Sequence, residues 1–341
     1  MRRSIGAATL LAVVTLVGAC STAATQAPTQ APATAAPATA APASAAPASA
    51  APASMTPASA APATAAPASA APAASIAAVP TSELVAPTKL TVCSDIPYAP
   101  QEFLDANGNP TGADIDIGAE IAKRLGLTEV VNNTVFDTII EAIASPKCDI
   151  ILSAMNITAP RVKAVDFIPY FQAGQSFVVS KGNPANITKT SDLCGKTVAV
   201  EAGTTEVDYL NGAGAYQGHG LSASCQAQGL KPITVSTFAK DSDAILALQS
   251  GHADAYFGDS PVAGYYVAQH PDQFQLSGLT VGVALEGIGV AKTNTQLRDA
   301  VQQALISMIN DGTYLNILNK YGVASDAITA AVAAKINYLG H

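Results

Sequence analysis

Short apolar runs alternate with amphipathic segments over most of the chain after residue 86. Residues 89–93 form a run that predicts a strand. Residues 114–125 carry apolar side chains four positions apart, the spacing of an amphipathic helix, which Gly126 would end. Further strands are predicted at 149–152, 177–179, 196–200, 233–238 and 253–257, further helices at 136–144, 205–210, 295–310 and through Ile245 and Leu248, and an apolar stretch rich in Val and Gly lies at 281–291. Because strands and helices alternate, the pattern predicts an α/β fold with largely parallel sheets covered by helices.

The stretch before this part has a different composition. No charged residue occurs between Arg3 and Glu83, and from residue 21 onward the stretch consists almost entirely of Ala, Pro, Ser and Thr. It has too few large apolar side chains to form a core, and its frequent prolines favour the extended polyproline II conformation. We therefore expect a disordered tether at residues 20–86, followed by a globular part at 87–341 that is long enough for two modest α/β lobes.

The N-terminus has the features of a secretory signal peptide. Two arginines precede an apolar run at residues 5–17, which is shorter than the about 20 residues that a helix needs to cross a bilayer. Residues 17–20, Val-Gly-Ala-Cys, resemble a bacterial lipobox, in which the cysteine is diacylated and becomes the first residue of the mature protein. We expect a lipoprotein signal peptide at 1–19 and a lipid anchor at Cys20, which gives an extracytoplasmic location at the cell membrane. The alternative is an ordinary signal peptide with an incidental cysteine.

The charge balance excludes some classes of partner. Loss of Arg2 and Arg3 with the signal peptide leaves 15 of the 17 basic side chains against 25 acidic ones, a net charge of about −10 with histidine neutral. Such an acidic surface argues against nucleic acid and anionic lipid as partners, so the N-terminal lipid would be the only membrane attachment. The four histidines have no metal-ligand spacing, and the sequence contains neither a Gly-x-Ser-x-Gly motif nor a P-loop. We expect no metal, no cofactor and no catalysis.

Four cysteines remain when Cys20 is set aside: Cys93, Cys148, Cys194 and Cys225. An even number of cysteines in an oxidising compartment indicates disulfides. Four cysteines allow three pairings, and free buried thiols are the alternative.

Several motifs in the globular part resemble a known family. Residues 94–100, Ser-Asp-Ile-Pro-Tyr-Ala-Pro, and residues 112–117, Gly-Ala-Asp-Ile-Asp-Ile, are similar to the opening of the polar amino-acid-binding proteins of ABC importers, solute-binding family 3. The pattern continues in order with 136–137, 149–158, Arg161, 165–167, 169–170, 195–200, 202–205, 254–255, Asp259 and 311–314. Each motif alone is weak, but their common order over most of the globular part makes the resemblance specific.

The resemblance implies an architecture. The family has the α/β fold of the type II periplasmic-binding-protein kind, in which two strands form a hinge between two lobes and the ligand cleft lies between the lobes. Lobe 1 would consist of residues 87–180 and 284–341, and lobe 2 of residues 181–283. It also favours disulfides within one lobe, Cys93–Cys148 and Cys194–Cys225, because a disulfide between the lobes would prevent hinge closure.

An amino-acid ligand needs a cation for its carboxylate, a carboxylate for its ammonium group and a wall for its side chain. The resemblance gives these roles to Arg161, whose guanidinium can bind a carboxylate through two hydrogen bonds, and to Asp259. Thr205 would close on the carboxylate from lobe 2. Without the resemblance, Arg161 would be interpreted as an ordinary surface residue. The remaining residues implied for the backbone end and the walls are Tyr98, Phe136, Ser153, Ala154, Asn156, which replaces the more common Ser or Thr, and Thr204.

Three acids, Asp95, Glu201 and Glu206, occupy positions that line the side-chain end in the family. Three carboxylates without a base would be costly in a closed cleft, which predicts a ligand with a cationic side chain: arginine, lysine, ornithine or histidine. The family has Asp95 whatever its ligand, and Glu206 can also point to solvent from its helix start. Glu201 therefore carries most of this prediction.

The sequence thus predicts the monomeric, extracytoplasmic binding component of an ABC importer, which delivers a small-molecule amino acid to the permease subunits. Two alternatives stay open. One is a ligand-sensing receptor module, and the other is an enzyme similar to cyclohexadienyl (prephenate or arogenate) dehydratase, which shares the fold.

Overall fold

The computed structural model describes residue 76 and residues 78–340. The predicted signal peptide at 1–19, the lipid attachment at Cys20 and the greater part of the tether at 20–86 lie outside the described residues.

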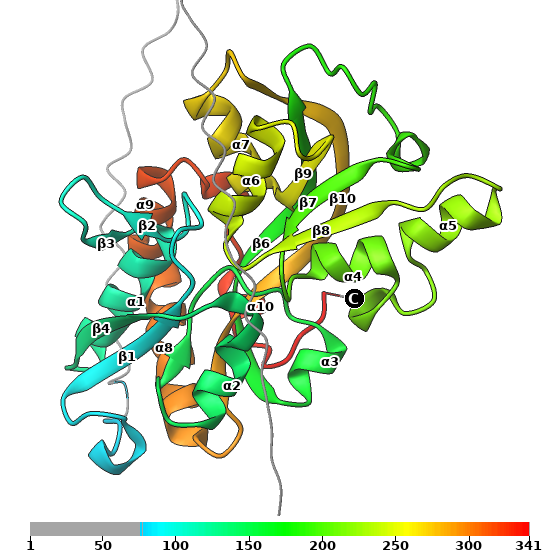
Figure 1. Cartoon of the computed structure of the whole chain (residues 1–341). Coiled ribbons are helices and arrows are strands. Elements are labelled where there is room, and N and C mark those ends of the chain that lie inside the picture. Colours follow the sequence, from blue (N-terminus) through cyan, green and yellow to red (C-terminus); the bar gives the residue numbers. More distant parts are fainter. Residues whose placement is uncertain (1–75, 77, 341) are drawn as a thin grey trace, which may run out of the picture. The chain divides into compact units, whose positions relative to one another are not determined.

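An eight-stranded mixed sheet runs through the described part, with the strand order β4-β1-β5-β10-β6-β9-β7-β8 (Figure 1). The strands are β1 (Lys89–Ser94), β4 (Thr128–Asn133), β5 (Ile150–Ile151), β6 (Val165–Ser180), β7 (Thr197–Glu201), β8 (Thr234–Phe238), β9 (Ala255–Asp259) and β10 (Phe274–Ala291), and β2 (Phe103–Leu104) pairs with β3 (Pro110–Thr111) in a separate hairpin. β1 is parallel to β4 and β5, and β7 is parallel to β8 and β9, as predicted. The two central strands differ from the prediction, because β10 is antiparallel to β5 and β6, and β6 is antiparallel to β9.

The long strands β6 and β10 belong to both halves of the sheet, and each half has its own hydrophobic core. Along β6, Ala173 packs in the first core and Phe177 in the second. Along β10, Leu285 packs in the first core and Val281 against the second. The pairing of the two strands shifts register near Val283, a β-bulge at the level where the cores change. The chain therefore has the predicted α/β fold of two lobes joined by two strands; we call the parts around these cores the first and the second lobe.

Helices cover both faces of each half of the sheet (Figure 1). The helices are α1 (Ala113–Arg124), α2 (Ile139–Ala144), α3 (Ala159–Val162), α4 (Thr205–Asn211), α5 (Leu221–Ala227), α6 (Asp241–Gln249), α7 (Ser260–Gln269), α8 (Thr295–Asp311), α9 (Thr313–Lys320) and α10 (Ala330–Ala333), with 3-10 turns η1 (Thr81–Glu83), η2 (Phe136–Thr138), η3 (Thr190–Leu193), η4 (Gly214–Tyr216) and η5 (Ala324–Asp326). In α1, Ile117 and Ile121 lie one turn apart and are both fully buried, as their spacing predicts. Gly312 ends α8 in the left-handed conformation, with φ of 84°, which glycine adopts without a steric penalty.

The folded part begins earlier than the predicted Pro87. Leu84 is buried in the first core, and the backbone N–H of Val85 donates to Asp149 Oδ1 over 2.7 Å. Asn294 Nδ2 donates to the carbonyl oxygen of Glu83 over 2.8 Å. These contacts fasten the residues just before β1 to the first lobe.

Two disulfides, Cys93–Cys148 and Cys194–Cys225, are present in the structure. Cys93 and Cys148 belong to the first core, whereas Cys225 belongs to the second, with Cys194 packed against it. Each disulfide thus lies within one lobe, and the structure has the pairing that the resemblance favours.

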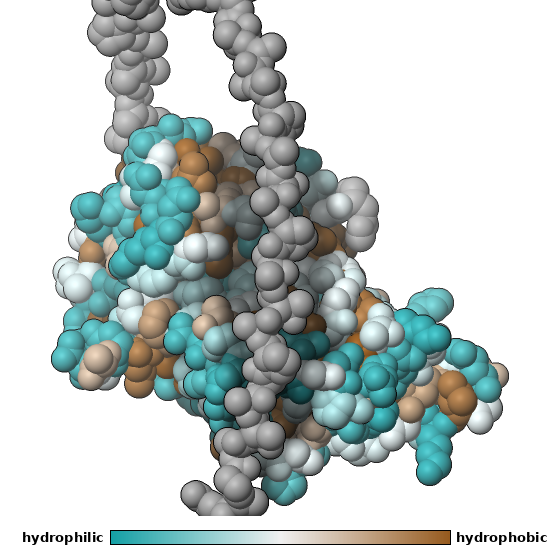
Figure 2. Space-filling model, turned by 90° about the horizontal axis from the view of Figure 1, so that it is seen from above, coloured by the Kyte–Doolittle hydropathy of each residue, from teal (hydrophilic) through white to brown (hydrophobic). Residues whose placement is uncertain are grey.

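Within residues 78–340, no helix has both the length and the apolar character needed to cross a membrane. The face seen in Figure 2 is mainly hydrophilic, with separate hydrophobic areas between the polar residues.

Candidate functional site

A small pocket lies between the two lobes. Its lining contains every predicted ligand residue except Arg161, and it adds Glu102. The lining residues are Asp95, Tyr98, Glu102, Phe136, Ser153, Ala154, Asn156, Glu201, Thr204, Thr205, Glu206 and Asp259.

The first lobe contributes the residues that follow its parallel strands. Asp95 follows β1, Phe136 follows β4, and Ser153 and Ala154 follow β5. The carboxyl ends of parallel strands meet at one edge of a sheet, which is where ligands bind in open α/β folds. The hydroxyl group of Ser153 ties this edge together, because it accepts the backbone N–H of Asp95 over 2.9 Å and donates to Glu102 Oε1 over 2.6 Å.

The second lobe contributes its strand ends in the same way. Glu201 is the last residue of β7, Thr204 precedes α4, and Asp259 ends β9 and precedes α7. Gly203, in the turn between β7 and α4, has φ of +78°. A Cβ atom at this position would lie 2.7 Å from the Cα of Asp137 in the first lobe, so only glycine allows the lobes to approach this closely here.

Several hydrogen bonds cross the cleft. The hydroxyl of Tyr98 in the first lobe donates to Asp259 Oδ2 over 2.8 Å. The hydroxyl of Thr205 in the second lobe donates to Asn156 Oδ1 over 2.6 Å. Together with the approach of Gly203 to the first lobe, these contacts describe a closed cleft.

Arg161 lies beside the pocket, in α3, whose N-cap residue Thr158 accepts the backbone N–H of Arg161 over 3.3 Å. Its guanidinium group donates to two backbone carbonyls, that of Asn156 from Nη1 and that of Gly203 from Nη2, both over 2.9 Å. The guanidinium carbon lies 5.3 Å from the ring centroid of Phe136, within the range of a cation–π interaction. A guanidinium has five N–H donors, so donors remain for an anion.

Buried carboxyl groups of the second lobe face the middle of the pocket. Burial raises the pKa of Asp259 well above its usual value, the charge of Glu206 raises it further, and the hydrogen bond from Tyr98 acts in the opposite direction. Asp259 Oδ1 and Glu206 Oε1 have no hydrogen-bond partner among the described residues. Two buried acceptors without donors fit a ligand that supplies an ammonium group.

Glu206 is only 2% exposed. The alternative that it points to solvent is therefore wrong. Burial raises the pKa of its carboxyl group, while hydrogen bonds and the charge of Arg161 lower it.

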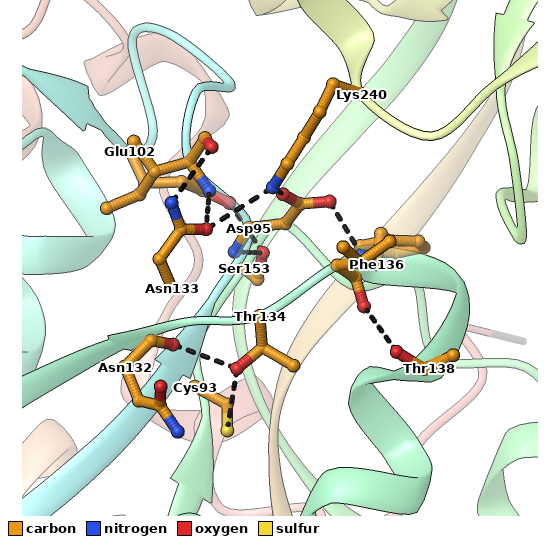
Figure 3. Close-up of polar contacts among 12 residues, drawn as sticks. Cys93, Asp95, Glu102, Asn132, Asn133, Thr134, Phe136, Thr138, Ser153 and Lys240 are labelled. Carbon is orange, nitrogen blue, oxygen red and sulfur yellow. Dashed lines mark hydrogen bonds and ion pairs between the residues drawn. The ribbon is translucent and has the colours of Figure 1, made fainter.

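At the side-chain end, Asp95 and Glu201 both line the pocket. A basic residue, Lys240, contacts Asp95 there (Figure 3). Asp95 Oδ2 accepts the backbone N–H of Phe136 over 2.7 Å, and Oδ1 accepts a hydrogen bond from Lys240 Nζ. Burial, together with the charges of Asp241 and Asp95, raises the pKa of Glu201 to about 10, against the opposing charge of Lys240. The prediction of acids without a base is thus wrong, because closure of the cleft brings in a lysine from 145 residues away.

A further group of buried acids, which sequence reasoning missed, consists of the pocket residue Glu102 and of Asp114 and Glu286 outside the lining. Burial raises the pKa of Asp114 to about 6, and it raises the pKa values of Glu102 and Glu286 well above the usual range. The hydroxyl of Tyr170 lies 2.7 Å from Asp114 Oδ2 and 3.3 Å from Glu286 Oε2. Asp114 Oδ2 also accepts the backbone N–H of Ala154, a pocket residue, over 2.9 Å. The group therefore supports the pocket floor. Glu102 lies four positions after Tyr98, just before the hairpin strand β2. Nothing in the local sequence indicates that its carboxyl group is buried.

The chain is similar to several known proteins. The model of the bacterial extracellular solute-binding proteins, family 3, matches residues 90–324. A relative from Escherichia coli (strain K12), the putative ABC transporter arginine-binding protein 2, is 29% identical over 254 residues, which cover 72% of this chain and 95% of that protein.

Two solved structures are similar in both sequence and fold. An ancestral arginine-binding protein bound to arginine has 36% sequence identity and a TM-score of 0.60, and the match covers 69% of this chain and 98% of that chain. The ancestral amino acid-binding protein AncCDT-1, described as a precursor of cyclohexadienyl dehydratase, has 34% identity and a TM-score of 0.57, with coverage of 69% and 95%.

Proposed function

The chain belongs to the bacterial extracellular solute-binding proteins of family 3, and we propose that it is the extracytoplasmic amino-acid-binding component of an ABC importer. The observation that carries this proposal is the closed pocket between the lobes, which has a guanidinium group at one end and buried, unpartnered carboxylate oxygens in the middle. This arrangement suits a zwitterion, because each ligand charge meets a group of opposite sign in a site shielded from water.

The ligand carboxylate would bind the free donors of Arg161 and the backbone N–H of Thr205, and the ligand ammonium would bind Asp259. Tyr98 and Phe136 would form the walls, since both line the pocket. Tyr98 is 8% exposed, and its hydroxyl group holds Asp259 in place through their hydrogen bond.

The side chain of the ligand would carry a positive charge. Asp95 and Glu201 lie at that end of the pocket, where Lys240 pairs with Asp95, while Glu201 stays protonated because its pKa is raised and it has no cation of its own among the described residues. A ligand guanidinium or ammonium group supplies the missing charge, so the expected ligands are arginine, lysine, ornithine and histidine. The arginine-binding relative and the arginine-bound structural neighbour support the same choice.

The lobes would exchange between open and closed arrangements about β6 and β10. We place the boundary in β10 at 283/284, which coincides with the register shift of that strand, and the boundary in β6 between Ala173 and Phe177, earlier than the predicted 180/181, because Phe177 already packs in the second core. We also propose that residues 1–19 are a signal peptide and that Cys20 is diacylated. The tether would let the monomeric protein reach the permease subunits.

We further propose that the site binds without catalysis. The similarity to a precursor of cyclohexadienyl dehydratase keeps an enzyme on this fold as the second candidate. Incubation of the purified protein with prephenate or arogenate decides between them, because formation of phenylpyruvate or phenylalanine would contradict the proposal.

Calorimetry of the ligand-free protein against a panel of amino acids tests the binding function. Arginine and citrulline form a matched pair, because they have nearly the same shape and differ in side-chain charge. We expect binding of arginine, lysine, ornithine or histidine to be stronger than binding of citrulline, glutamine or glutamate. Preference for glutamate or an apolar amino acid would contradict the cationic ligand, and absence of any binding would contradict the function.

Mass spectrometry of the mature protein tests the anchor. A diacylated N-terminal cysteine is expected, and an unmodified N-terminus would contradict it.

A further inference from the structure

Lys240 connects the two lobes through the side-chain end of the pocket. It is the N-cap residue of α6 in the second lobe, and its Nζ reaches across the cleft to Asp95 Oδ1 of the first lobe (Figure 3). The same Nζ lies 3.3 Å from Asn133 Oδ1. Asp95 is buried, at 3% exposure, whereas the side chain of Lys240 keeps 25% of its surface exposed.

Asp95 already has a cationic partner in the closed cleft. Its Oδ2 accepts the backbone N–H of Phe136, and its Oδ1 accepts Lys240. A ligand with a cationic side chain would bring a second positive charge to this carboxylate. Two cations at one carboxylate repel each other in a site that excludes water, so the ligand and Lys240 compete.

We propose that Lys240 is a specificity-determining residue: it neutralises Asp95 while the cleft holds no cationic ligand, and a ligand cation takes its place when one binds. This inference rests on the proposed function, in which Asp95 faces the side chain of the ligand. It goes further by giving a role to a residue that does not line the pocket and comes from the other lobe.

The lysine can leave without a large penalty. Its side chain has a flexible four-carbon stem, and it is partly exposed at the closed cleft, so the ammonium group regains water when it turns outward. Asp95 cannot move in this way, since it is buried and held by the backbone of Phe136.

Lys240 would have opposite effects on two classes of ligand. For a cationic ligand, the lysine is a competitor, and it weakens binding. For a neutral ligand of the same shape, the lysine stays on Asp95 and prevents a buried unpaired carboxylate in the closed complex, so it strengthens binding. Lys240 thus reduces the difference in affinity between cationic ligands and neutral ligands of the same shape.

The test compares arginine and citrulline binding by calorimetry in the wild type and in Lys240→Met, which keeps the length of the side chain and removes its charge. We expect the affinity for arginine to rise about tenfold and that for citrulline to fall about threefold, the order of effect of one partly exposed ion pair. Lys231→Met, at an exposed lysine of the same lobe, is the matched control and should change neither affinity. Lys240→Arg should keep the wild-type ratio of affinities, since it keeps the charge.

Three outcomes overturn the inference. An unchanged ratio of arginine to citrulline affinity in Lys240→Met would mean that the lysine does not compete. Equal weakening of both ligands would make Lys240 a simple latch of the closed cleft, and weaker binding of arginine alone would make it a ligand contact. Circular dichroism and thermal melting of each variant confirm that it is folded. If the wild type binds no amino acid, the proposed function itself fails, which is a different result from wild-type binding with an unchanged ratio.

Discussion

Arg161 at one end of the cleft donates to two backbone carbonyls, whereas Lys240 at the other end pairs with the carboxylate of Asp95. A carbonyl is a neutral acceptor, so the charge of Arg161 remains available for an anion, and its two hydrogen bonds only fix its direction. The charge of Lys240 is neutralised by its partner. We infer from this comparison that the Arg161 end is preorganised for the carboxylate of an amino acid, while the Asp95 end, whose charge is already paired, would rearrange for a cationic side chain.

Removal of the cation at the Arg161 end should have the largest effect. In Arg161→Ala, the ligand carboxylate would be buried without its partner, and we expect the affinity for arginine to fall more than about 100-fold. Calorimetry with the full panel should find the same loss for citrulline, because both ligands carry this carboxylate. Arg298→Ala is the control, since Arg298 pairs with Asp166 away from the pocket. Unaltered affinity in Arg161→Ala would place the ligand elsewhere.

A substitution that affects only closure of the cleft should weaken the binding of arginine and of citrulline equally. Gly203→Ala adds a Cβ atom that would lie 2.7 Å from the Cα of Asp137, at a backbone φ of +78° that alanine disfavours. We expect about tenfold weaker binding of both arginine and citrulline, with an unchanged ratio between them. Small-angle scattering should show a more open ligand-bound state. A change in the ratio would mean that Gly203 acts on the side-chain end and would weaken the comparison.

The carboxyl group of Glu201 should matter only for charged ligands. In Glu201→Gln the shape is kept but no negative charge can form, so the affinity for arginine should fall about tenfold and that for citrulline less than threefold. Calorimetry in buffers of different ionisation enthalpy adds a second measurement. The wild type should release protons when it binds arginine, because the ligand cation favours the ionised form of Glu201, and the variant should release fewer. Equal loss for both ligands would remove Glu201 from the side-chain end.

The smallest expected effect is on stability. The pKa of Glu201 is raised in the folded state to about 10, so above pH 4.5 the unfolded chain loses a proton that the folded chain keeps. Stability therefore falls as pH rises, and we expect the ligand-free protein to lose at least about 1 kcal/mol between pH 5 and 9. Denaturant melts should find a shallower loss in Glu201→Gln. Asp166 is the control. Its pKa is lowered to about 2, so it stays ionised between pH 5 and 9 and contributes the same amount to the free energy of unfolding over this range. Asp166→Asn should lower stability at every pH without changing the slope.

The sequence predicted most of the strands and helices because their periodicity is local. β7 and α4 were placed within one or two residues. The length and direction of β6 and β10 were missed, since these strands cross between lobes and carry polar residues and glycines that break a simple apolar run. Only the family resemblance pointed to a hinge there.

The resemblance pointed to Asp95, Ser153 and Asp259, and all three line the pocket. Contacts that exist only when the cleft is closed could not be predicted from the local pattern of apolar and polar residues. The pairing of Lys240 with Asp95 spans 145 positions, and nothing near Lys240 distinguishes it from an exposed lysine before a helix. The burial of Glu206 was missed for the same reason, because the opposite lobe covers it.

The contacts of the residues just before β1 have a mechanical consequence. Leu84 packs in the first core, and Glu83 and Val85 are held by Asn294 and Asp149, all in the first lobe. Asn294 follows β10, whose last residue pairs with the first residue of β6, at strand ends away from the level where the cores change. Tension applied through the N-terminal segment would be transmitted to this lobe and would not load the strands about which the lobes turn. If the protein is anchored through its N-terminal tether, a force on the tether would therefore act on the first lobe and would not weaken ligand binding in the cleft.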